Sequence, residues 1–259
     1  MWTQVTIVRH GETDWNRIGR LQGHRQIALS QRGREQAQAV ADYLAAERFD
    51  AVLSSDLVRA LSTAKAIAAR KRQRVAADPR LREWHLGILS GLTHGEAARL
   101  HPKEYAIYRG AKSDESIPGG ESPGQRHERV IRAVSELAER HPGGRVLVVT
   151  HGGPLDDCYR HATATPLLAP KDFQLYNAGI NRFVIDAGQW RLESWGEIAH
   201  LTQIGTLGNW EPEYEDPMTT RSGLSSSQGI THAKASRDCR QGPGFDQLPS
   251  RPNGEEPFP

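Results

Sequence analysis

Two histidines, each followed directly by glycine, are the residues of this chain best suited to chemistry. His10 comes just after the apolar run 5–8, and His151 comes just after the apolar run 146–149. A histidine at the end of a buried strand is held rigidly, while its ring can still face a crevice. A neutral imidazole can attack phosphorus through one ring nitrogen if the other nitrogen is a fixed donor. Because the preceding Arg9 can bind two phosphate oxygens at once, the pattern predicts a pocket that handles phosphate.

Arg59 adds a second guanidinium to this predicted pocket. It falls in the first turn of the helix expected after residues 54–57, so it would reach the same crevice from the next strand–helix unit. His151 would be a third donor, most effective as an imidazolium, and three cationic groups would match the charge of a phosphoryl transition state. Each residue alone also fits a structural histidine or a surface arginine. Their occurrence together is what favours a role in phosphoryl chemistry over a structural one.

The elements that must position these residues alternate between strands and helices. Short apolar runs predict strands buried on both faces, and amphipathic spacing predicts the helices between them. This alternation indicates an α/β fold with a three-layer, doubly wound, mostly parallel sheet and helices on both faces. In such sheets ligands bind at the carboxyl ends of the strands, which is where His10 and His151 fall. The expected strands are 5–8, 51–53, 146–149, 182–185 and 190–195, and the expected helices are 30–47, 57–70, 122–140 and 153–162.

Two stretches depart from this pattern. Residues 93–120 are polar, aromatic and without clear periodicity, which predicts an irregular lid or substrate-contacting insertion, or else a solvated connection that touches nothing. Residues 204–259 contain 7 Gly, 7 Pro and 6 Ser among 56 residues. Since that composition is typical of disorder, we expect a domain over 1–203 followed by a disordered, low-complexity tail over 204–259.

The composition excludes several classes of partner. The formal net charge is +2, so no global field would recruit nucleic acid or an anionic membrane, and neither is an expected partner. We expect no signal peptide and no membrane span, because no long apolar stretch is present. The 2 cysteines do not make a disulfide framework and predict a cytoplasmic location. No metal is expected, since the predicted pocket meets phosphate charge with arginine and histidine rather than with a carboxylate cluster.

The motifs, taken in chain order over about residues 3–203, resemble those of the histidine phosphatase superfamily. That superfamily contains the cofactor-dependent phosphoglycerate mutases and many related phosphatases, and the short-insertion phosphatase branch is the better match. Residues 204–259 lie outside the resemblance. The matching blocks are 9–13 with Asn16, 21–23, 29–33, 54–60 with Thr63, 81–87, 117–122, 150–153, Asn177 and 195–201.

The resemblance implies a role for each matching position. His10 would be the nucleophile that becomes phosphohistidine, and Glu83 would donate a proton to the leaving oxygen and then activate the incoming water. His151 would stabilise charge on the phosphoryl group as the third catalytic residue. The apolar neighbours of Glu83 favour this role over that of a surface glutamate paired with Arg82, because burial favours a protonated carboxyl. The residues implied to bind phosphate or substrate are Arg9, Asn16, Gln22, Gly23, Arg59 and Gly152.

Three functions remain open at this point. The 68 positions from Glu83 to His151 resemble the shorter phosphatase-type spacing, so we expect a phosphomonoesterase that acts on a small phosphorylated metabolite without a cofactor. The first alternative is a phosphoglycerate mutase, which would need 2,3-bisphosphoglycerate and would have to exclude water. The second is a non-catalytic relative that binds phosphorylated ligands. A homodimer is also possible, since members of the family are often dimers.

Overall fold

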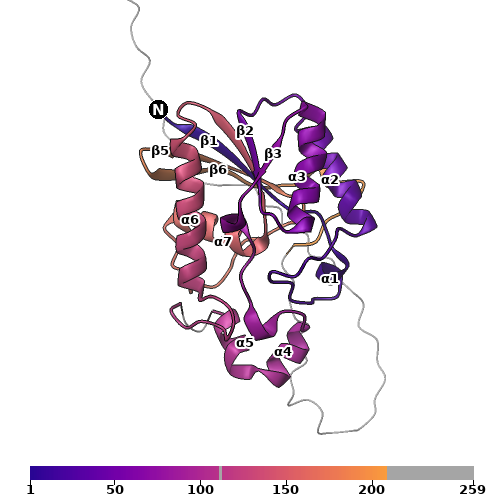
Figure 1. Cartoon of the computed structure of the whole chain (residues 1–259), viewed down its shortest axis with the longest axis vertical. Coiled ribbons are helices and arrows are strands. Elements are labelled where there is room, and N and C mark those ends of the chain that lie inside the picture. The colour runs from indigo at the N-terminus through magenta and orange to yellow at the C-terminus, as the bar shows by residue number, and fades with distance from the viewer. Residues whose placement is uncertain (111–112, 209–259) are drawn as a thin grey trace, which may run out of the picture. The chain divides into compact units, whose positions relative to one another are not determined.

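A six-stranded sheet lies at the centre of the fold (Figure 1), and His10 and His151 each directly follow one of its strands. The computed structural model describes residues 1–110 and 113–208; nearly all of the predicted tail therefore lies outside the described residues. The strand order is β3-β2-β4-β1-β5-β6, with β1 parallel to β4, β4 parallel to β2 and β2 parallel to β3, whereas β5 is antiparallel to both of its neighbours. The strands are β1 Thr3–Arg9, β2 Ala51–Ser54, β3 Val75–Ala77, β4 Arg145–Thr150, β5 Ile180–Asp186 and β6 Gln189–Glu197.

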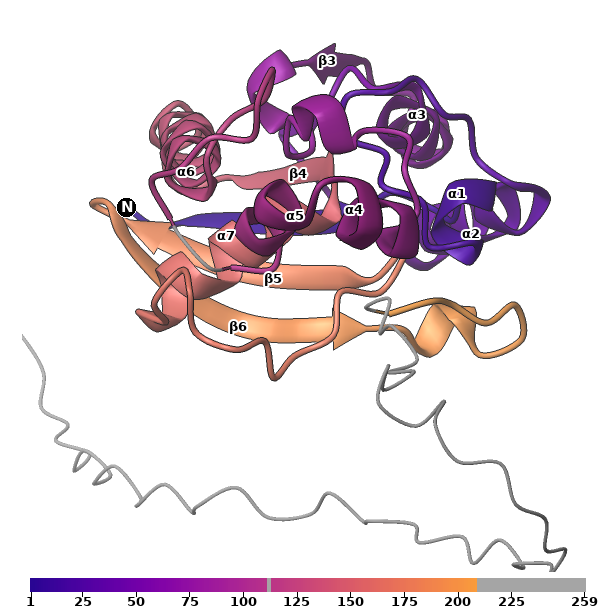
Figure 2. The same cartoon turned by 90° about the horizontal axis from the view of Figure 1, so that it is seen from below.

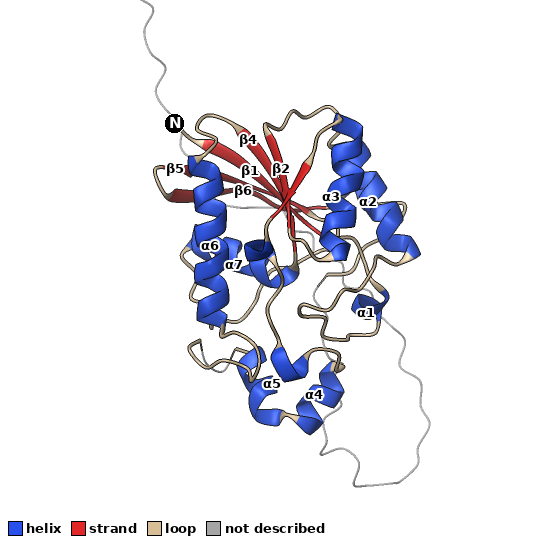
Figure 3. Cartoon of the chain, viewed as in Figure 1, coloured by secondary structure: helices blue, strands red, loops and turns tan. Residues whose placement is uncertain are grey.

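Helices cover both faces of the sheet, which confirms the predicted fold class (Figures 2 and 3). Helices α6 and α7 pack on one face through one apolar cluster, and α2 and α3 pack on the other through a second cluster. The short strand β3 is missing from the prediction because its 3 residues are too few for an apolar run to stand out. The helices are α1 Asp14–Arg17, α2 Gln31–Tyr43, α3 Val58–Lys71, α4 His94–Leu100, α5 Pro102–Tyr108, α6 Pro123–Glu139 and α7 Gly152–Thr163, with 3₁₀ turns at Pro79–Leu81, Gly87–Leu89 and Ala199–Leu201.

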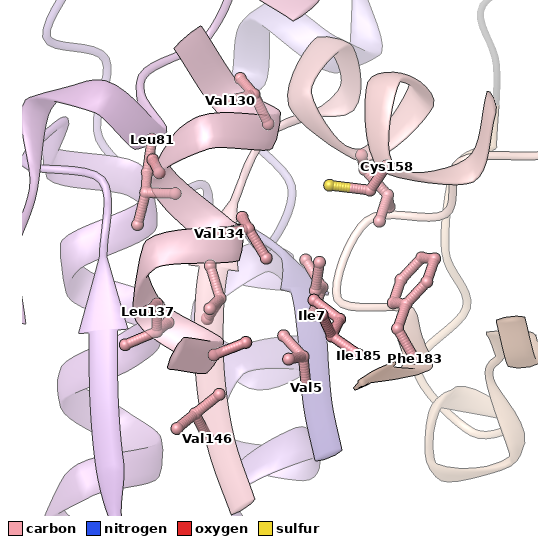
Figure 4. Close-up of a cluster of buried hydrophobic side chains, with 14 of the residues drawn as sticks. Val5, Ile7, Leu81, Val130, Val134, Leu137, Val146, Cys158, Phe183 and Ile185 are labelled. Atoms are coloured by element: carbon pink, nitrogen blue, oxygen red, sulfur yellow. The ribbon is translucent and has the colours of Figure 1, made fainter. Parts of the chain in front are cut away.

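Alternation along the central strands divides their side chains between the two faces. In β1, Val5 and Ile7 join the cluster under α6 and α7, while Val8 joins the cluster under α2 and α3. Figure 4 shows the first cluster, in which Phe183 of β5 and Val134 of α6 lie among the strand residues. Because the central strands are buried on both sides, they are rigid supports for whatever follows their carboxyl ends.

Local sequence signals determine where several of these elements begin and turn. The Ser30 hydroxyl accepts the Gly33 N–H at the start of α2, and Ser122 forms a capping box with Gln125 at the start of α6, each as the sequence predicts. The β5–β6 hairpin turns at Ala187 and Gly188, whose φ angles are 47° and 80°. Two consecutive positive φ angles are typical of the two-residue turns that match strand twist.

The stretch 93–120 is not irregular throughout, so that prediction was wrong in part. It forms α4 and α5, which lie below the carboxyl ends of the strands in Figure 1. Thr93 and Glu96 make a capping box that starts α4. Each helix has only 7 residues, which is too short for a periodic pattern to stand out. Their stability comes from a third apolar cluster, made of Leu21, Trp84, Leu86, Leu89, Ala97, Ile107 and Ile117.

Residues 204–208, the described beginning of the predicted tail, contact the domain. Asn177 donates its backbone N–H to the Leu207 carbonyl at 2.9 Å, and Gln36 donates to the Gly205 carbonyl at 2.8 Å. The division at residue 203 stays a prediction. Among the described residues, no helix is both long and apolar enough to cross a membrane.

Phe183→Ala should lower the free energy of unfolding by about 3–5 kcal/mol, because the side chain is completely buried and its loss leaves a cavity between β5 and the helices. Urea unfolding followed by circular dichroism measures the change. Trp2→Ala is the control, since Trp2 is 53% exposed, and an equal loss in both variants would contradict this account of the core.

Candidate active site

A cavity of about 620 Å³ opens at the carboxyl ends of the parallel strands. All of the predicted site residues except His151 line it, although they come from six separate parts of the chain. The residues of the predicted set in the cavity wall are Arg9, His10, Asn16, Gln22, Gly23, Arg59, Glu83 and Gly152. The catalytic and binding roles assigned to them stay predictions; their convergence on one cavity is a structural finding.

His10 is held in a state suited to nucleophilic attack. Its Nδ1 lies 2.7 Å from the Gly11 carbonyl, so Nδ1 carries the proton and Nε2 is left with a lone pair. Burial lowers the pKa of His10 well below its ordinary value of 6.5, and the Arg59 and Arg9 guanidinium groups lower it further. The ring is therefore neutral near pH 7. Asn177 fixes the backbone at this point by donating to the His10 carbonyl at 3.0 Å.

His151 lies against His10, with ring centroids 5.1 Å apart. Its Nε2 lies 2.8 Å from the Ser55 hydroxyl, and its buried Nδ1 has no hydrogen-bond partner among the described residues. Burial, Arg59 and His10 lower its pKa well below 6.5. The ring is thus neutral near pH 7, and the role of His151 as an imidazolium beside phosphate stays a prediction, since a phosphate dianion next to it would favour protonation.

The two arginines are fixed in the cavity by backbone carbonyls. Arg59 is fully buried and donates to the Arg25 and Gly23 carbonyls, each at 2.9 Å. Burial lowers its pKa to about 10, so it remains cationic at pH 7. Arg9 donates to the Leu175 carbonyl. Both guanidinium groups keep a buried Nε without a partner among the described residues, and such donors suit the oxygens of a phosphate.

Gln22 and Asn16 contribute polar groups in different ways. The buried Gln22 Oε1 has no hydrogen-bond partner among the described residues, so it can accept a hydroxyl or amine of a ligand. Asn16 accepts the Thr13 N–H at 3.0 Å and so helps cap α1, while it also lines the cavity. Gly23 acts through its carbonyl, which holds Arg59 in place.

Glu83 is anchored at the start of α7. Its Oε1 accepts the Trp84 N–H at 2.8 Å and the Gly153 N–H at 3.0 Å. A Cβ at position 153 would overlap Glu83 Oε1, whereas a Cβ at position 152 would find nothing closer than 3.7 Å. Glycine at 153 is therefore needed for the carboxyl to reach the helix N-terminus. This leaves Oε2 as the oxygen available to a leaving group.

Several residues of the site were missed by the sequence analysis. Arg126 lines the cavity, is bound at both Nε and Nη2 by Asp157 at 2.7 and 2.8 Å, and lies 4.5 Å from the Trp84 ring centroid. Tyr108 also lines the cavity, and burial together with Glu83 raises its pKa. Arg126 looks like any arginine of a polar helix face, and its partner is far away in the chain. Sequence spacing therefore gave no signal for it.

Residues around the site position it without facing the cavity. Glu12 accepts the Ser30 hydroxyl at 3.0 Å, so it supports the start of α2 and is not part of the cavity wall. Glu121 accepts the His85 N–H at 3.0 Å and pairs with Arg129, which fixes the segment that carries Glu83. No group of three His, Cys, Asp or Glu residues suited to a metal ion is found in the described part of the chain.

This arrangement places a neutral imidazole, two fixed cations and a carboxyl around one cavity. Charge developing on a phosphoryl group would meet Arg9 and Arg59, and the leaving oxygen would meet Glu83. The same set of groups defines a class of phosphoryl-transfer enzymes that work through a histidine. The family model of the histidine phosphatase superfamily (branch 1) matches residues 5–198, so the chain belongs to that superfamily. The predicted family is thereby confirmed.

Two plant proteins and one bacterial structure illustrate the range of its relatives. The chain is 38% identical over 210 residues to phosphoglycerate mutase-like protein 4 of Arabidopsis thaliana, covering 80% of this chain and 90% of the relative. It is 40% identical over 208 residues to the metal-independent phosphoserine phosphatase of the same plant, covering 79% and 86%. The solved structure of YhfR from Bacillus stearothermophilus superposes with a TM-score of 0.71 at 31% identity, covering 77% and 99%.

The two neutral histidines should make the fold sensitive to acid. Below about pH 6.5, His10 and His151 bind protons in the unfolded chain but not in the folded chain, where their pKa values are lowered. The free energy of unfolding therefore falls as the pH falls, by at most about 1.4 kcal/mol per histidine and pH unit. Urea unfolding at pH 7.5 and 5.5 should show a smaller loss in His10→Gln than in the wild type. His141→Gln, at a half-buried histidine outside the cavity, should keep the full loss; an unchanged loss in His10→Gln would contradict the assignment.

Proposed function

We propose that this protein is a phosphomonoesterase that hydrolyses a small phosphorylated metabolite through a phosphohistidine on His10. The observation that carries the proposal is the His10 ring, whose Nδ1 is fixed on the Gly11 carbonyl at 2.7 Å and whose pKa is lowered by burial and by two arginines. A buried neutral imidazole beside two cations does little to stabilise the fold. It is, however, well suited to attack a phosphate dianion as a nucleophile.

The reaction has two balanced steps. In the first, His10 Nε2 attacks phosphorus, the P–O bond to the alcohol breaks, and the Glu83 carboxyl gives its proton to the leaving oxygen. In the second, the Glu83 carboxylate takes a proton from water, the water oxygen attacks phosphorus, and the P–N bond breaks. Inorganic phosphate leaves and both groups return to their starting states. Arg9 and Arg59 hold the phosphoryl oxygens throughout, and no metal takes part.

Hydrolysis is favoured over the mutase reaction by the short segment between Glu83 and His151, which is 68 positions long. A mutase must exclude water and retain a bisphosphate while it turns over. In its described residues this segment forms the 3₁₀ turn Gly87–Leu89, the short helices α4 and α5, and then α6 and β4. The relatives include proteins named as mutase-like and as a metal-independent phosphatase, which is consistent with either outcome for the phosphoryl group. The cytoplasmic location and a homodimer stay predictions.

His10→Ala should abolish phosphate release, by about 10³-fold or more, because the covalent route is lost. The measurement is steady-state release of phosphate from a panel of sugar phosphates, phosphoglycerates, phosphoserine and nucleotides. Wild-type protein quenched during turnover should carry an acid-labile phosphoryl group on His10. Transfer between the 2- and 3-positions of phosphoglycerate that depends on bisphosphoglycerate, with no net hydrolysis, would instead establish the mutase. If neither activity is detected, the non-catalytic alternative is favoured.

The Glu83 anchor should matter most for poor leaving groups. Glu83→Gln should slow hydrolysis of an alkyl phosphate by about 10²–10⁴-fold but slow p-nitrophenyl phosphate much less, since that leaving group needs no proton. Gly153→Ala should show the same selectivity, with a loss of roughly tenfold or more, because the added methyl displaces the carboxyl. Gly95→Ala is the matched control, as nothing lies within 4 Å of the added methyl. Equal losses on both esters would argue against Glu83 as the proton donor.

A further inference from the structure

The cavity continues well beyond the phosphoryl-binding groups along one face of α7. Gly152, Gly153, Asp156 and Arg160 all line it, and this spacing places them on one side of the helix. At a rise of 1.5 Å per residue, Arg160 lies roughly 12 Å along the helix axis from Gly152. The wall that begins at the phosphoryl site therefore ends at a different set of charged groups.

That far end carries an excess of positive charge. Asp156 accepts Arg160 Nε at 2.9 Å and pairs with Lys171 Nζ at 3.3 Å, so one carboxylate faces two cations. The carboxylate is 12% exposed and the Arg160 side chain 4% exposed, whereas Lys171 is 34% exposed. The three residues have a net charge of +1, and the Lys171 side chain is the most accessible of them.

The loop that carries Lys171 is tied to α7 by Arg160 as well as by the Lys171–Asp156 pair. Arg160 Nη1 donates to the Pro166 carbonyl at 2.6 Å, which ties the beginning of the loop to α7. The apolar residues Leu167, Leu168 and Pro170 of this loop line the cavity beside Lys171. The cavity wall thus offers an apolar surface that leads to a cation, a combination suited to a ligand with a carbon body and an anionic end.

The phosphoryl group cannot be what this second cation serves. Arg9 and Arg59 lie next to His10 and supply the positive charge that a phosphoryl dianion needs. A substrate with one phosphate and a short neutral alcohol would leave the Asp156–Arg160–Lys171 group unbalanced and most of a 620 Å³ cavity unfilled. Both the charge and the length of the wall therefore point to the leaving group.

We propose that Lys171, together with Arg160, forms a distal anion subsite, and that the substrate is a phosphomonoester whose alcohol carries a second anionic group, a carboxylate or a phosphate, several bonds away from the ester. The substrate class rests on the proposed hydrolysis at His10. The subsite itself is a binding property of the α7 wall. Lys171 is a specificity-determining residue in this account, because it contacts the leaving group and not the reacting phosphorus.

The test uses three phosphate esters of a six-carbon chain. They differ only in the group at the far end of the chain, which is a neutral hydroxyl, a carboxylate or a second phosphate. The wild type should show kcat/KM values at least about tenfold higher for the carboxylate or the bisphosphate than for the hydroxyl. Which of the two is preferred identifies the anion. Equal values for all three would overturn the subsite.

Lys171→Gln should reduce the ratio of acidic to neutral ester by about fivefold or more, and Lys171→Glu should bring the ratio below one, because the charge is reversed. Lys65→Gln, at an exposed lysine on α3 away from the cavity wall, should leave the ratio at the wild-type value. If both Lys171 variants lose activity equally on all three esters, the lysine only stabilises the loop and the proposal is wrong.

A binding measurement separates this proposal from the proposed function. Non-hydrolysable phosphonates, one with a six-carbon chain ending in carboxylate and one ending in hydroxyl, are titrated calorimetrically into the wild type and Lys171→Gln. The subsite is supported if the wild type prefers the acidic phosphonate and Lys171→Gln does not, even if no ester is hydrolysed. In that case only the hydrolase proposal fails. Equal affinities for both phosphonates overturn the subsite whatever the rates.

Discussion

The parallel pairing of β1 with β4 is the constraint on which the site depends. Its register sets Arg9 opposite Thr150, and His10 then donates its backbone N–H to the Thr150 carbonyl at 2.9 Å. The residues that follow the two strands must therefore lie side by side, which brings the rings of His10 and His151 to 5.1 Å between centroids. Both strands are buried on both faces, so neither ring can move away without disturbing the core.

Burial at this position has an electrostatic consequence that serves the chemistry. The two histidines and two arginines share one desolvated region, and like charges there would repel strongly. The rings respond by staying neutral, as the lowered pKa values of His10 and His151 indicate. The arginines remain cationic, and Glu83 lies near enough to offset part of their charge. A phosphate dianion would offset the remaining positive charge of the two arginines, which is the electrostatic basis of the proposed function.

Much of the fold and the central part of the predicted site (Arg9, His10, Arg59 and His151) could be derived from local sequence, whereas the other site residues were implied by the family resemblance. Apolar runs located the central strands, Ser30 and Ser122 located helix starts, and the strand-end histidines located the cavity. The exceptions share a physical cause. Strand β3 and helices α4 and α5 are too short for periodicity to identify, and they are held by tertiary contacts such as the third apolar cluster. Local propensity contributes little to elements of this length.

The sequence by itself determined which residues to propose for phosphoryl chemistry, because the strand-end histidines and the arginines stand in local patterns and the other positions match motifs of the histidine phosphatase superfamily. Only the tertiary structure decided the pKa shifts of the two histidines, the anchoring of Glu83 on Gly153 and the shape of the cavity along α7. Arg126 of α6 pairs with Asp157 of α7, and Lys171 of the loop after α7 pairs with Asp156 of that helix. Burial and pairing are properties of the packed chain, and no spacing along the sequence encodes them.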